Sequence, residues 1–77
     1  MIHELDTVVL TRDINEHGLQ QGDVGAVVHV YPDGVAFEVE FVTAEGWTVA
    51  VLTLSASDVR PMREREILHA RELAPAA

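Results

Sequence analysis

Apolar residues alternate with other residues along two neighbouring stretches of the chain, 24–30 and 35–41. This period of two is typical of β-strands, in which successive side chains point to opposite faces. In the first stretch the alternation assigns four residues to the protein core: Val24, Ala26, Val28 and Val30. In the second stretch the predicted core residues are Val35, Phe37, Val39 and Phe41, and the opposite face carries Ala36, Glu38 and Glu40. Tyr31-Pro32-Asp33-Gly34 between them has the residues of a tight turn, so the two strands are expected to form a hairpin.

Further β-rich stretches surround this hairpin. A first strand is expected at Asp6–Thr11 and a short last strand at Val59–Arg60, which Pro61 ends. The stretch Thr48–Leu54 is apolar on both faces, as in a strand that is covered on both sides or faces a partner. Asp13–Asp23 contains two glycines and no clear period, so it is expected to be a long loop.

The stretch Met62–Leu73 differs in kind, because it consists of helix formers without glycine, proline or threonine. We expect a helix with an apolar stripe at spacings of three and four, made of Ile67, Ala70, Leu73 and Ala74. A helix of about three turns has little stability alone. It is therefore expected to dock on the doubly apolar strand, in the same chain or in a second copy, which makes Ile67, Ala70 and Leu73 candidate self-association residues.

Five short strands, with a long loop after the first and a tight turn before the last, follow the order of an SH3-like small barrel. The predicted fold is therefore mostly β. It consists of a small five-stranded SH3-like β-barrel over residues 1–61, followed by a C-terminal helical tail over residues 62–77.

A linked run of motifs adds a family resemblance. The motifs are Leu5-Asp6-Thr7-Val8-Val9-Leu10, Glu16-His17-Gly18-Leu19, Gly22-Asp23-Val24-Gly25-Ala26-Val27-Val28, Tyr31, Phe37-Glu38-Val39-Glu40-Phe41 and Leu52-Thr53-Leu54. Over about residues 4–61 the chain resembles the small bacterial DUF4926 family. The resemblance implies an SH3-like barrel of uncharacterised function, and it does not extend to the tail.

The charge balance narrows the choice of partners. The 77 residues carry 13 acidic and 5 basic side chains, a formal net charge of −8 with neutral histidines, and no lysine. Nucleic acids and anionic membranes are bound largely through lysine and arginine. Such a surface repels both and favours a basic protein partner, although net charge also serves simply to keep a small domain in solution.

The composition excludes several other classes of protein. A chain without cysteine has no disulfide, thiolate metal site or cysteine nucleophile. No apolar stretch approaches the roughly 20 residues that span a bilayer, and no signal peptide is recognisable, so a cytoplasmic protein is expected.

The candidate catalytic and metal-binding groups are poorly arranged for chemistry. Glu38 and Glu40 lie on a strand face that is predicted to be solvated, which offers no pocket to separate the pKa values of an acid–base pair. Zinc needs three or four converging ligands, and the cluster around His3 and Asp6 lacks such a spacing. His29 is more simply explained by a cross-strand contact with one of the two glutamates. We therefore expect no enzyme, no cofactor and no metal.

The remaining candidates are contacts for a partner. Trp47 follows a turn directly and is either a core residue or an exposed anchor, since tryptophan is enriched at interface hot spots. Tyr31 joins it if the fold brings the two turns together. With Glu38 and Glu40 these residues suggest a small acidic interaction or regulatory module that docks a basic protein partner, with an antitoxin- or immunity-like role as its concrete form.

Two other functions stay open from the sequence. The stretch Gly22–Val28 resembles the KOW-type stretch of ribosomal and transcription-elongation proteins, which points to a nucleic-acid-binding barrel, but it lacks the basic residues that bind RNA. SH3-like barrels also occur as accessory subunits of enzymes, which suggests a subunit that binds a metal or ligand.

Overall fold

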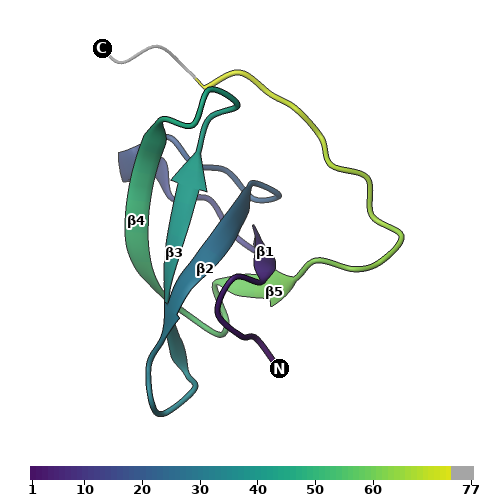
Figure 1. Ribbon diagram of the computed structural model, residues 1–77. Coiled ribbons are helices and arrows are strands. Elements are labelled where there is room, and N and C mark those ends of the chain that lie inside the picture. The colour runs from purple at the N-terminus through teal and green to yellow at the C-terminus, as the bar shows by residue number, and fades with distance from the viewer. Residues whose placement is uncertain (74–77) are drawn as a thin grey trace.

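The computed structural model describes residues 1–73, in which five antiparallel strands form one sheet (Figure 1). The strands are β1 (Thr7–Leu10), β2 (Val24–Val30), β3 (Ala36–Val42), β4 (Thr48–Ser55) and β5 (Val59–Pro61). A single 3-10 turn, η1 (Asn15–His17), lies in the long loop after β1. The order across the sheet is β4-β3-β2-β1-β5, so β4 and β5 are its two edges. The mostly-β prediction with five strands is confirmed.

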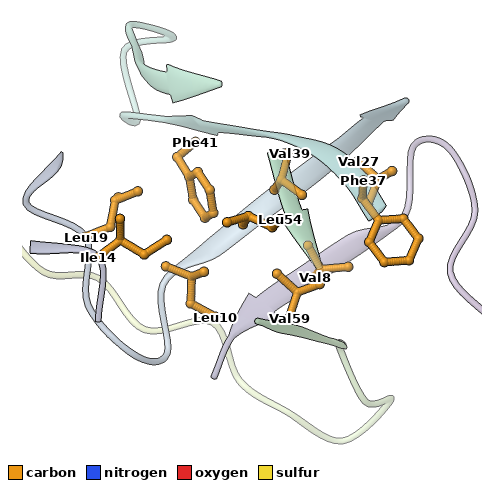
Figure 2. Packing of buried hydrophobic residues seen from close by; sticks show 10 residues of the cluster. All are labelled: Val8, Leu10, Ile14, Leu19, Val27, Phe37, Val39, Phe41, Leu54 and Val59. Carbon is orange, nitrogen blue, oxygen red and sulfur yellow. The ribbon is translucent and has the colours of Figure 1, made fainter. Parts of the chain in front are cut away.

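All five strands contribute to one hydrophobic core. Its buried residues are Val8, Leu10, Ile14, Leu19, Val27, Phe37, Val39, Phe41, Leu54 and Val59. Figure 2 shows Ile14 and Leu19, which come from the long loop, at one end of this cluster and Phe37 at the other. The loop therefore closes one end of the core, and an isolated bridge between Ile14 and Leu19 links the two sides of the loop.

The predicted core face of β2 is wrong at Ala26 and Val28. Val27 is fully buried, whereas Val28 is 43% exposed and Ala26 is also exposed. The register against β3 shifts between Val27 and His29, so that Val28 is the extra residue of a β-bulge. Because of this bulge Val30 returns to the core side and packs against the cluster.

In β3 the predicted alternation is confirmed for Phe37, Val39 and Phe41, which are all buried. Val35 precedes the strand and is exposed, so that part of the prediction is wrong. The hairpin turn is present, and the N–H of Gly34 donates to the carbonyl of Tyr31 at 2.9 Å.

Gly25 is the glycine that packing requires. A Cβ atom at this position would lie 2.6 Å from Cγ1 of Val39 and 2.8 Å from Cε1 of Phe41. The close approach of β2 and β3 therefore leaves no room for a side chain there.

The predicted C-terminal helix is wrong. Residues 62–73 contain one turn and otherwise follow an irregular path, which leaves β5, swings away from the strands and returns to the end of the sheet that carries the β3–β4 turn (Figure 1). Ile67 is 92% exposed, and without a helix it shares no stripe with Ala70 and Leu73. Ala74, the fourth residue of the predicted stripe, lies outside the described residues.

An ion pair organises the start of this path. The guanidinium of Arg60 binds both carboxylate oxygens of Glu66, at 2.8 and 2.7 Å, and the N–H of Arg63 donates to the same carboxylate at 2.6 Å. These contacts form a local turn in place of the first helical turns.

Among the described residues there is no helix long and apolar enough to cross a membrane.

Candidate functional site

The acidic residues of β3 lie on the sheet face opposite the core. In the cross-strand register Glu38 has His29 on one side and Thr53 on the other. Glu40 lies between Ala26 and Val51 in the same way. Both glutamates are half-buried, so neighbouring side chains flank them while solvent still reaches them.

Hydroxyl groups hold both carboxylates in place. The Tyr31 hydroxyl donates to Oε1 of Glu38 at 2.9 Å, and Thr53 Oγ1 donates to the same oxygen. Thr48 Oγ1 donates to Oε2 of Glu40 at 2.8 Å. The hydrogen bonds from Thr53 and Tyr31 lower the pKa of Glu38 below its ordinary value of 4.5, so it is ionised at neutral pH.

His29 lies beside these groups. Its ring meets the Tyr31 ring edge-on, with ring centroids 4.8 Å apart. Its register partner is Glu38, as one of the two predicted pairings requires, but its closest carboxylate is Glu4, 3.8 Å from Nδ1. Within residues 1–73 no three metal-ligating side chains converge, so the geometry provides no metal centre there.

Trp47 is 71% exposed, so its interpretation as a core residue is wrong. Thr43 fixes the turn that carries it: the Thr43 N–H donates to the Trp47 carbonyl at 2.9 Å, and the Trp47 N–H donates to Thr43 Oγ1 at 3.2 Å. Tyr31 lies in the hairpin at the other end of β3, so the fold does not bring the two turns together (Figure 1).

Glu38 and Glu40 instead form hydrogen bonds toward the two ends of β3. Glu38 bonds Tyr31, and Glu40 bonds Thr48, the neighbour of Trp47 in the chain. We call Tyr31, Glu38, Glu40 and Trp47 the β3 strip. The alternation in β3 predicted its glutamates, whereas the orienting threonines were missed, because only the register between β3 and β4 identifies them.

Three of the five arginines form ion pairs with carboxylates of the same chain. Arg12 binds Asp58 at 2.8 Å, Arg60 binds Glu66 and Arg71 binds Asp23. Hydrogen bonds from Arg12 lower the pKa of Asp58, and those from Arg60 lower the pKa of Glu66 to about 2. These arginines are therefore poorly placed to bind phosphate groups.

A family model for a domain of unknown function, DUF4926, matches residues 4–61. The chain belongs to the DUF4926 family. No curated protein and no solved structure matches the chain. The matched residues include all five strands, the whole core and the β3 strip, so these belong to the DUF4926 domain.

The tail lies outside the DUF4926 match, yet it is tied to the domain by an ion pair. Arg71 donates through Nε and Nη2 to the two carboxylate oxygens of Asp23, at 2.8 and 2.5 Å, and through Nη2 to the Gly18 carbonyl at 2.9 Å. These bonds lower the pKa of Asp23 below 3.8. This pair could not be predicted from the sequence, because its partners lie 48 residues apart in the chain.

A groove of about 450 Å³ lies between the tail and the DUF4926 domain. Its lining includes Leu68, Ala70 and Leu73 from the tail and Phe41 and Val49 from the sheet. Two of the predicted self-association residues thus face the chain's own domain, and Ile67 is not among the lining residues.

Proposed function

We propose that this DUF4926 domain is a small SH3-like barrel that serves as a protein-interaction module and docks a basic protein partner through the β3 strip. One observation carries the proposal: two glutamates on an outer strand face are held by hydroxyl groups, Tyr31 bonds one of them, and an exposed tryptophan lies in the turn beyond the other end of the strand. Carboxylates that are already oriented lose little freedom when they bind a cation. Aromatic and arginine contacts commonly carry the binding energy at interfaces.

An antitoxin- or immunity-like role is the concrete form of this proposal. The acidic domain would cover a basic functional surface of its partner, and the net charge of −8 would speed their encounter. In that case production of the partner without the domain arrests growth, and production of both restores it.

The test is a comparison of matched baits in extracts of the native host. The double variant Glu38→Gln, Glu40→Gln keeps hydrogen-bond acceptors for the hydroxyl groups but removes two charges. The control Glu16→Gln, Glu64→Gln removes two charges from exposed positions outside the β3 strip. A partner of the proposed kind is a basic protein that the wild type and the control retain and the double variant loses.

The captured protein is then purified and its binding to the domain measured directly. We expect its Kd to rise steeply with salt, because exposed charge pairs are screened. The variant Trp47→Ala should weaken the complex by about 2 kcal/mol or more if Trp47 is an anchor. Equal binding by the double variant and the control would contradict the proposal.

A further inference from the structure

Within residues 1–73 the strand β4 is an open edge of the sheet, with no strand paired outside it. It has eight residues and contains no proline, glycine or charged side chain. Proteins usually protect edges with such residues or keep them short, because an open edge pairs with other chains. The opposite edge fits that rule, since β5 has three residues and ends in Pro61.

The backbone groups that β4 leaves open follow from the alternation in an antiparallel pair. The Ala56 N–H donates to the Val35 carbonyl, so even-numbered residues at this end face β3. Thr53 and Val51 consequently direct their N–H and C=O groups away from the sheet. At Ser55 both outward groups are used, because its N–H and carbonyl bond Asp58.

The side chains beside these open groups are acidic on one face and apolar on the other. Glu38 accepts a hydrogen bond from Thr53 as well as from Tyr31, and Glu40 accepts one from Thr48, so residues of β4 hold both carboxylates beside the edge strand. On the core side Leu52 is only partly buried at the edge.

We infer that the partner contributes an extended basic segment that adds to the sheet as a strand beside β4. This inference rests on the proposed function and specifies how the β3 strip is used. Residues opposite Val51 and Thr53 would form backbone hydrogen bonds with them and place lysine or arginine side chains over Glu38 and Glu40. The intervening residues would be apolar and pack beside Leu52.

A second copy of the chain fits this edge poorly. Antiparallel pairing of two β4 strands would bring Glu38 and Glu40 of both copies to the same face of one sheet. Like charges across strands are destabilising, and each copy carries a net charge of −8. The same carboxylates that attract a basic strand therefore oppose self-pairing.

The probe for this inference is a peptide of alternating lysine and valine, acetyl-Lys-Val-Lys-Val-Lys-Val-Lys-amide, added to the full chain at low salt. Its control carries N-methyl groups on the lysine amides, which keep the charge but remove the donors that face β4. A second control replaces every lysine by glutamate. The readout is hydrogen exchange of single amides by NMR.

At a peptide concentration of about ten times Kd we expect exchange of the Val51 and Thr53 amides to slow about tenfold. The Leu52 amide faces β3 and should change far less. The N-methylated and glutamate peptides should give no such protection. The double variant Glu38→Gln, Glu40→Gln should bind the lysine peptide at least about tenfold more weakly.

Other outcomes separate the two proposals. Equal binding of the lysine peptide and its N-methylated form, lost in the double variant, would overturn strand addition and leave the acidic docking surface standing. Protection at Val51 and Thr53 that the double variant retains would support strand addition and contradict the role of the carboxylates. Absence of binding at millimolar peptide, or protection of both amides in a dimer without peptide, would overturn the inference.

Discussion

Val27 and Val28 are neighbours in β2, yet the first is fully buried and the second is 43% exposed. Because the two side chains are identical, the hydrophobic pattern alone cannot show which of them is buried. The bulge that separates them is fixed by pairing with β3, where Val39 faces Val27 and Glu38 faces His29. Which of the two valines faces the core is therefore determined by the pairing of β2 with β3.

The same substitution at these two positions should therefore have different effects. We expect Val27→Thr to reduce the free energy of unfolding by about 1–3 kcal/mol, because its hydroxyl would be buried without a partner. Val28→Thr should change it by less than about 0.5 kcal/mol. Urea denaturation of the two variants checks this, and similar midpoints would contradict the observed phase of β2.

Gly25 provides a second test at this scale. The variant Gly25→Ala places a methyl group against Val39 and Phe41 at distances well below van der Waals contact. We expect a loss of about 1–3 kcal/mol in the free energy of unfolding. The variant Val39→Ala would open space beside the new methyl group. The double variant should therefore lose less free energy of unfolding than the two single variants lose when their losses are added.

Much of the secondary structure could be predicted from the sequence. Phe37, Val39 and Phe41 alternate without interruption, and their strand and burial were predicted. The exposure of Trp47 was not, because it depends on the direction of a turn. The tail was mispredicted because helix propensity reports only local preferences, whereas Arg71 is held by Asp23, which lies 48 residues away in the chain.

The tail's attachment can be tested by removing its cation. In Arg71→Gln we expect NMR order parameters of residues 68–72 to fall below about 0.6, the range of flexible backbone. The control Arg65→Gln, whose side chain has no ion pair within residues 1–73, should leave them unchanged. Equal mobility in both variants would show that the Arg71–Asp23 pair does not hold the tail.

The same attachment should depend on pH in one direction. The bonds from Arg71 lower the pKa of Asp23 from 3.8, so the folded form holds the proton less tightly than the unfolded form. The resulting stabilisation is complete above pH 3.8 and is lost as the pH falls through the lower value of the folded form. We expect tail order parameters of the wild type to stay constant from pH 7 to pH 5 and to approach those of Arg71→Gln in stronger acid. A tail released near neutral pH would contradict this.

At the scale of the whole molecule, charge decides what the surface attracts. Three of the five arginines are paired within the chain, and there is no lysine. We expect no measurable binding to duplex DNA or RNA by fluorescence anisotropy at about 0.15 M salt. Micromolar binding under these conditions would favour the KOW-like function over a basic protein partner.

The pairing of β1 with β5 has a consequence for how the chain folds. Val8 lies opposite Pro61, so the first strand obtains its second neighbour only when the last strand arrives. Contacts between distant parts of a chain slow folding, because the chain loses the entropy of a long loop before the contact forms. During synthesis at about 5–20 residues per second, strands β1 to β4 emerge with both sides of the sheet open. The nascent domain therefore exposes a second open edge, at β1, until β5 has emerged and paired, so before the sheet is complete any other strand finds two edges at which it can pair.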